Sequence, residues 1–337
     1  MGNCCKVMPA LMAALLLSNS ALADEGGVSV WLPGTYGSLA ATPKAPGWAF
    51  GAVYYHTSVS ASGSVAGARE VTIGRLKPTV TVNLNANLRA NADLVLLNPS
   101  YAFAEPLFGG QLALGVVGIV GRNHTSLDGT ITAGVAGFST TRSGSIDSSV
   151  TGLGDLYPKA TLSWNMGVHN FMTYLTGDIP VGSYESNRLA NLGIGHGAID
   201  GGAGYTYFNP QTGFEVSAVT GITYNLKNTS TDYQNGVDWH LDWGMSQFIS
   251  KQIHVGAVGY LYNQLTADRG AAPFLGDNKS SVAGIGPQIG YIFPAGGRQG
   301  YLNLKGYYEF EADHRARGWN VWLTFAISPA PQAPPRP

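Results

Sequence analysis

The sequence predicts an all-β protein, a single transmembrane antiparallel β-barrel of about twelve strands. Three observations predict it: long runs of alternating apolar and polar residues, a composition rich in glycine and poor in charge, and connections that alternate between short and long. Successive side chains of a strand point to opposite faces, so a wall between lipid and water needs such alternation. A large soluble β-sandwich also has alternating strands and is the alternative fold.

The clearest alternating run extends from Thr79 to Leu94, with the sequence T-V-T-V-N-L-N-A-N-L-R-A-N-A-D-L. Its even positions are all Val, Leu or Ala, and its odd positions are all Thr, Asn, Arg or Asp. Asparagine is a poor strand former, so its repetition on one face indicates that this face is wet. We expect the apolar face to meet lipid and the polar face to line the lumen, with these candidates: Asn83, Asn85, Asn87 and Arg89.

The composition also favours a barrel in a membrane. Of 337 residues, 46 are glycine, 12% are charged and 11% are aromatic, whereas soluble domains have about 25% charged residues and about 7% glycine. After residue 20, no uninterrupted apolar stretch reaches the ~18 residues that a transmembrane helix needs. The net charge of −1 argues against nucleic acid as a partner, because phosphate binding needs a basic surface.

The first residues have the features of a signal peptide. Lys6 precedes an apolar core at 11–17, and Ala21-Leu22-Ala23 is a small-x-small cleavage site before Asp24. Both cysteines, Cys4 and Cys5, precede the core, so the mature chain should contain no thiol. We therefore expect export across the inner membrane, cleavage after residue 23, and residence in the outer membrane of a Gram-negative cell.

The exported chain divides into three predicted parts. Residues 24–46, rich in Gly, Pro and Ala, form either a plug within the barrel or a flexible periplasmic leader. Residues 47–328 form the transmembrane barrel. Residues 329–337 include five prolines, which cannot join a sheet ladder, so they should form a disordered periplasmic tail.

Strands are expected near residues 47–59, 79–104, 111–124, 150–166, 169–183, 196–208, 213–227, 236–249, 252–266, 281–293, 299–312 and 318–328. The connections between them are alternately short and mostly long, as in outer-membrane barrels, where the short turns are periplasmic. The longest loops are expected at 60–78 and 125–149. The run at 79–104 contains Pro99, and a hidden turn there would raise the count to fourteen strands.

Later strands repeat the two-faced pattern at 214–225, 237–245 and 302–311. Trp239, Trp319 and Phe325 lie on apolar faces and would serve as interfacial aromatic residues. The polar faces and inward tyrosines supply further candidates for the lumen lining: Asp155, Tyr157, Lys159, Glu215, Asp238, His240, Asp242, Tyr260, Tyr262, Lys305, Tyr307 and Glu309.

Some of these candidates suggest what the lumen does. Tyrosines at expected inward positions, Tyr101 among them, suit a phenolic solute through ring stacking and a hydrogen bond, and they equally suit a closed, filled lumen. Asp155 and Lys159 share a face and could pair across strands with Lys305 and Glu309, either to set selectivity or to hold the wall together. The strand at 111–124 is small or apolar on both faces, so part of the lumen wall should be dry.

Metal and enzyme chemistry are weaker interpretations. Asp238, His240 and Asp242 are two residues apart, which separates neighbours by about 6.5–7 Å along one strand, too far for a compact metal site. We expect lumen polarity there, with no metal and no cofactor. A membrane hydrolase would need a Ser/His pair, for which these residues are available without a local motif: Ser163, Ser217, Ser246, His196, His240 and His254.

Several motifs along the chain resemble those of one family: Gly152-Leu153-Gly154-Asp155 with Pro158, Thr176-Gly177-Asp178, Asn191-Leu192-Gly193, the run from Asn228 to Gly236, Leu241-Asp242-Trp243, Gly256 to Tyr260, Gln264, Gly286-Pro287 and Lys305-Gly306. By these motifs the chain resembles a family of predicted outer-membrane barrel proteins catalogued under the meta pathway of phenol degradation. The resemblance covers most of 47–328. It implies a likeness to hydrophobic-compound transporters of the fatty-acid-channel type, and it implies no catalytic residue.

The sequence thus predicts a non-enzymatic outer-membrane channel for passive uptake of small aromatic or otherwise hydrophobic compounds. Its expected partners are outer-membrane lipid, the barrel assembly machinery and the solute. One alternative is a structural or adhesive barrel whose long loops, 125–149 above all, form the working surface. The other is a lipid hydrolase of the outer membrane.

Overall fold

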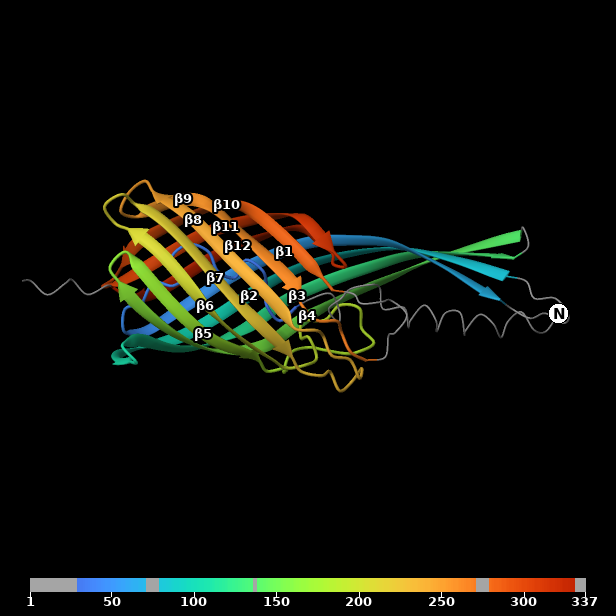
Figure 1. Cartoon of the computed structure of the whole chain (residues 1–337), viewed down its shortest axis with the longest axis horizontal. Coiled ribbons are helices and arrows are strands. Elements are labelled where there is room, and N and C mark those ends of the chain that lie inside the picture. Colours follow the sequence, from blue (N-terminus) through green and yellow to red (C-terminus); the bar gives the residue numbers. More distant parts are fainter. Residues whose placement is uncertain (1–28, 71–78, 136–137, 271–278, 331–337) are drawn as a thin grey trace, which may run out of the picture.

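The computed structural model describes residues 29–70, 79–135, 138–270 and 279–330 of the chain. Twelve antiparallel strands close into one barrel in sequence order, and the first strand pairs with the last (Figure 1). The strands are β1 (Gly47–Glu70), β2 (Thr79–Leu107), β3 (Gly110–Val135), β4 (Phe138–Met166), β5 (His169–Asp178), β6 (Ala198–Asn209), β7 (Phe214–Asn225), β8 (Asp238–Phe248), β9 (Ile253–Gln264), β10 (Ser281–Ala295), β11 (Arg298–Asp313) and β12 (Arg317–Pro329).

The predicted all-β barrel of twelve strands is confirmed. β2 passes through Pro99 without a turn, so the alternative count of fourteen is wrong. A sandwich is excluded as well, because the described strands close on themselves and do not face a second sheet. In the described ranges, no helix is long and apolar enough to cross a membrane. The predicted signal peptide (1–23) and residues 331–337 of the predicted tail lie outside the described residues.

Two connections differ from the prediction. Residues 60–70 and 125–149, expected to be loops, belong largely to strands, because β1–β2 and β3–β4 are long hairpins. β12 pairs with β1 only as far as Ser60 and Arg317. Beyond that level the hairpins continue alone and project far past the rest of the barrel (Figure 1). We call this part the projecting sheet (61–70, 79–88, 127–135 and 138–146).

The outer surface of the barrel is apolar all the way around. Every strand exposes at least one large apolar side chain: Phe50, Leu97, Leu114, Leu156, Leu175, Ile199, Ile222, Met245, Leu261, Ile289, Leu304 and Leu323. On β7, β8 and β11 the intervening residues Glu215, Asp242 and Lys305 are buried inside. A continuous apolar belt of this extent is unusual for a soluble monomer and is stable when it faces hydrocarbon.

On β2 the predicted faces are inverted. Leu94 and Leu96 pack into a hydrophobic cluster inside the barrel, whereas Leu97 is exposed on the outside. The pairing with β1 has no register shift, so the same alternation continues toward residue 79 and buries Leu88 on the inner side. The prediction that four residues of this strand line the lumen is therefore wrong, because they lie exposed on the outer face: Asn83, Asn85, Asn87 and Arg89.

The register of β2 against β1 sets the inversion, and it holds along the whole paired strand. The polar side chains at 83–87 are stable outside because this part extends past the barrel, where the outer surface meets water. Tyr101, also expected inside, shares the outer face with Leu97 and packs against Trp48 and Phe103. The alternation of a strand defines two faces, and the register against its neighbours decides which of them points inward.

Candidate functional site

Residues 29–46, which we call the lumen segment, run through the interior of the barrel. At the end with the longer loops, Arg315 donates a hydrogen bond to the Ser29 hydroxyl at 3.4 Å. At the end with the short turns, the Lys44 N–H donates to the Gln111 side chain at 2.7 Å, just before β1 begins. Between these points Trp31 and Ala41 are buried. The segment therefore spans the lumen from one mouth to the other (Figure 1, blue).

Two buried charges hold the middle of the lumen segment. The Asp242 carboxylate accepts the backbone N–H groups of Gly34 and Tyr36, each at 2.9 Å. From β11, the Lys305 ammonium donates to the carbonyl oxygens of Gly34 at 2.6 Å and Tyr36 at 3.2 Å. Hydrogen bonds to charged groups are about twice as strong as neutral ones. We call this arrangement the Asp242–Lys305 clamp.

Further side chains of the barrel wall form hydrogen bonds with residues 38–41 of the lumen segment, which follow the clamp in the chain. Glu215 accepts the Leu39 N–H at 2.8 Å, and Thr206 accepts the Ala41 N–H at 3.0 Å. The hydroxyl groups of Ser38 and Ser246 lie 2.6 Å apart. Buried backbone groups must find partners, and here inward polar side chains supply them in place of a sheet or helix.

The Thr206 contact gives a graded prediction. Thr206→Val keeps the side-chain shape but leaves the buried Ala41 N–H without its acceptor, which should weaken local attachment by about 1–3 kcal/mol. Hydrogen exchange of the Ala41 amide should then be about 5- to 150-fold faster. Thr223→Val is the matched control, because the Thr223 hydroxyl bonds Asp200 and not the segment. Equal exchange in both variants would show that Thr206 does not hold the segment.

Aromatic rings surround the beginning of the lumen segment. The indole of Trp31 is stacked on the imidazole of His240, with centroids 3.7 Å apart and planes 11° apart. The ring centroids of Tyr174 and Tyr36 lie 5.9 and 5.8 Å from that of the Trp31 indole. His240 Nε2 lies 2.9 Å from the Asp200 carboxylate. We call His240, Tyr174 and Tyr36 the aromatic box.

The other candidates from the sequence lie inside the barrel in different roles. The interior contains Asp155, Tyr157, Lys159, Glu215, Asp238, His240, Asp242, Tyr260, Tyr262, Lys305, Tyr307 and Glu309. The proposed cross-strand charge pairs are wrong. Asp155 instead accepts the N–H groups of Gly182 and Ile194, the Lys159 ammonium lies 4.3 Å from the Tyr36 ring centroid, and Glu309 accepts the Tyr260 hydroxyl.

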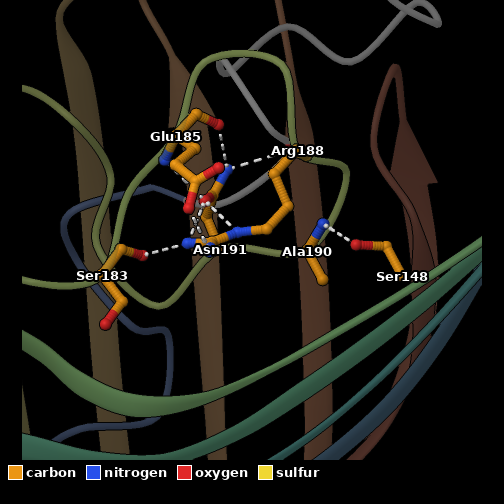
Figure 2. A network of polar contacts seen from close by, with 6 residues as sticks. All are labelled: Ser148, Ser183, Glu185, Arg188, Ala190 and Asn191. Atoms are coloured by element: carbon orange, nitrogen blue, oxygen red, sulfur yellow. Dashed lines mark hydrogen bonds and ion pairs between the residues drawn. The ribbon is translucent and has the colours of Figure 1, made fainter.

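The loop after β5 covers the inner face of β4 at the end of the barrel with the longer loops. Figure 2 shows its internal bonds, in which Arg188 contacts Glu185 at 2.8 Å and Asn191 at 3.0 Å. The Ala190 N–H reaches the Ser148 hydroxyl of β4 at 3.3 Å. These bonds and the Asp155 carboxylate give the loop a defined shape over one side of the mouth.

One of the Ser/His combinations considered from the sequence does come together. His254 Nδ1 lies 3.1 Å from the Ser246 hydroxyl, and its Nε2 lies 3.1 Å from the Tyr301 hydroxyl. Ser38 of the lumen segment and Gln288 also contact the Ser246 hydroxyl. The pair is buried and its histidine is oriented by a phenol, whereas a hydrolytic triad uses a carboxylate there. Across the described ranges, no group of three or more His, Cys, Asp and Glu side chains could hold a metal ion.

Sequence patterns missed the residues of the lumen segment and several of their partners. Trp31 and Ser38 lie in a stretch without periodicity, and no motif marks Tyr174 on β5 or Asp200 and Thr206 on β6. One usable signal was present: Asp200 falls on the inward parity of β6, next to glycines. A carboxylate on the inner face of a strand indicates that another side chain inside the barrel forms a hydrogen bond or ion pair with it.

Comparison with known proteins agrees with this architecture. A crystal structure of an outer membrane channel from Pseudomonas putida F1 is similar, with a TM-score of 0.60, 14% identity, and coverage of 88% of this chain and 99% of that one. CdiB from Acinetobacter baumannii (TM-score 0.31, 10% identity, 82% and 60% coverage) and the CymD monoaromatic hydrocarbon channel (0.27, 11%, 86% and 89%) are more distant. No curated protein sequence matches.

The family comparison covers most of the chain. The family described as "Putative MetA-pathway of phenol degradation" matches residues 60–325, from β1 into β12. The match includes β2 to β11 entirely, parts of β1 and β12, and both halves of the clamp, and it begins after the lumen segment. The barrel and its inward charges are thus within the matched region, and the chain belongs to this phenol-degradation family.

Proposed function

We propose that this protein is an outer-membrane channel for the passive uptake of small aromatic or otherwise hydrophobic compounds. The observation that carries the proposal is the lumen itself. It is filled by a peptide segment held through hydrogen bonds to wall side chains, Asp242 and Lys305 foremost. A barrel closed only by its own side chains would offer no comparable way to open.

The apolar belt supports the membrane location. With large apolar side chains exposed on all twelve strands, lipid is the environment in which this surface is stable. Outer-membrane lipid and the barrel assembly machinery are therefore the proposed partners, after export and cleavage of the signal peptide. The similar fold of the Pseudomonas putida outer membrane channel is consistent with this location.

The wall chemistry supports the solute class. Inside the barrel, Leu96, Ile119 and Val258 form one cluster together with Tyr260 and Tyr262. Apolar and aromatic side chains with a few polar groups are the usual lining of sites for small organic molecules. Membership in a family connected with phenol degradation supports an aromatic solute.

Two other functions have less support. A surface role in adhesion gains one observation, because the projecting sheet extends past the barrel where loops were expected (Figure 1). A lipid hydrolase is disfavoured, because the Ser246 hydroxyl is capped by Ser38 and its histidine is bonded to a phenol. We therefore propose a protein that is not an enzyme.

Growth of a Gram-negative host on aromatic carbon sources at limiting concentration tests the proposal. Cells that lack the protein should grow more slowly on phenol and related compounds than cells that carry it, and equally well on a small polar acid. The Ser38→Cys/Ser246→Cys barrel is the matched control, because a disulfide between these two positions should keep the folded barrel closed. Unchanged growth across the aromatic panel would remove this solute class.

A further inference from the structure

The ring of Trp31 is enclosed as a bound ligand would be. Its side chain is only 6% exposed. One face is stacked on His240 at 3.7 Å, and Tyr174 and Tyr36 lie around it at 5.9 and 5.8 Å. Offset or parallel ring pairs at such distances are favourable beyond the area they bury. The aromatic box therefore recognises a flat aromatic ring, and Trp31 is the ring that occupies it.

The polar groups around this ring are poorly matched by an indole. Several buried side-chain atoms of the described residues have no hydrogen-bond partner, and four of them belong to this site: Trp31 Nε1, Tyr36 Oη, Asp200 Oδ1 and His240 Nδ1. Buried polar atoms are nearly always paired, so a cluster of unpaired ones calls for an explanation. Asp200 and Tyr36 offer an acceptor and a hydroxyl that a hydroxylated ring could bond. Trp31 satisfies the stacking part of the site and leaves the polar part unused.

The attachment of the lumen segment lets Trp31 move separately. The Asp242–Lys305 clamp holds residues 34–36, which begin three residues after Trp31. The Thr35 N–H donates to the Leu32 carbonyl at 3.2 Å, so a turn starts one residue after Trp31 and includes Gly34 of the clamp. The bonds of the clamp fall on residues 34–36, so we expect release of the indole to require rearrangement of 29–33, where Arg315 bonds Ser29, and not opening of the clamp.

From this geometry we propose that the aromatic box is a binding site for a small phenolic solute and that Trp31 is its built-in competitor. A solute would stack on His240 in place of the indole, with its hydroxyl directed to Asp200 or Tyr36. Because only protein with an empty box can bind, the apparent affinity for the solute equals the intrinsic affinity multiplied by the fraction of protein in which Trp31 has left the box. This inference rests on the proposed uptake function for its solute class, and it concerns equilibrium binding, which can be measured without transport.

Equilibrium dialysis of labelled phenol against the purified full-length barrel in lipid nanodiscs tests the proposal. Trp31→Ala should bind phenol about tenfold more tightly than the unsubstituted protein or better, because the competing ring is gone. The double variant Trp31→Ala/His240→Ala should bind phenol no more tightly than the unsubstituted protein, because the ring on which phenol would stack is gone. Trp319→Ala, which removes a tryptophan from the outer surface, is the matched control and should bind like the unsubstituted protein. Cyclohexanol has the hydroxyl but no aromatic ring, so its affinity should be nearly the same for Trp31→Ala and for the unsubstituted protein.

Each outcome bears on the proposal. Equal phenol binding by Trp31→Ala and the unsubstituted protein would overturn it, and so would an equal gain for cyclohexanol, which would indicate a simple cavity. Heat-dependent gel mobility verifies that each variant is a folded barrel. Uptake in cells is measured on the same variants. Tighter binding without uptake would reject the channel but keep the site, whereas uptake with unchanged binding would reject the site but keep the channel.

Discussion

The Ser38→Cys/Ser246→Cys variant should conduct when reduced and be silent when oxidised. The two hydroxyl oxygens lie 2.6 Å apart, close to the ~2.0 Å separation of sulfur atoms in a disulfide, so small side-chain adjustments should allow the bond. One residue belongs to the lumen segment and the other to β8. The disulfide would tie the segment covalently to the wall and prevent any opening that requires it to leave.

Planar bilayers with lipopolysaccharide in the outer leaflet provide the measurement. Addition of a reductant should restore openings in the same membrane, with at least a tenfold increase in conducting events. Cys4 and Cys5 are replaced by serine in all variants, so only the engineered pair can react. The two single-cysteine variants should conduct with or without reductant. Full conduction by protein that is demonstrably cross-linked would show that solutes pass without displacement of the segment.

Asp242→Ala should have the second-largest effect and should open the channel. The substitution removes both hydrogen bonds to the backbone of 34–36. It also removes a carboxylate charge that acts electrostatically on the Lys305 ammonium. Each hydrogen bond to a charged group contributes about 1.5–3 kcal/mol, so the closed state should weaken by about 3 kcal/mol or more. That corresponds to about a hundredfold or greater shift toward the open state.

Open probability in single-channel records is the measurement for this prediction. Asp238→Ala is a matched control, since it removes an inward carboxylate of the same strand that bonds the Asn225 side chain of the wall. It should leave the open probability near that of the unsubstituted protein. Lys305→Met should also raise it, because the carbonyl groups of the segment lose their donor. If Asp238→Ala opened the barrel as readily as Asp242→Ala, loss of negative charge and not loss of the clamp would be the cause.

Local sequence patterns predicted the strand count because each strand carries its own signal. Alternation of side chains has a period of two, and short turns such as Gly296-Gly297 interrupt it sharply. Reliance on local patterns also explains why the loop predicted at 125–149 is wrong. Their Ser, Thr and Gly content is typical of loops, and only the ladder between β3 and β4 makes them a hairpin.

By itself, the sequence determined that this chain is an all-β barrel with two-faced strands, and it indicated its family. Only the tertiary structure decided which face of β2 points inward, because register depends on pairing with β1 and β3. Only the tertiary structure brought Asp242 and Lys305 to the backbone of residues 34–36, more than 200 positions away in the chain. Contacts at such separations leave no local periodicity, since they are made by closure of the barrel around the segment it holds.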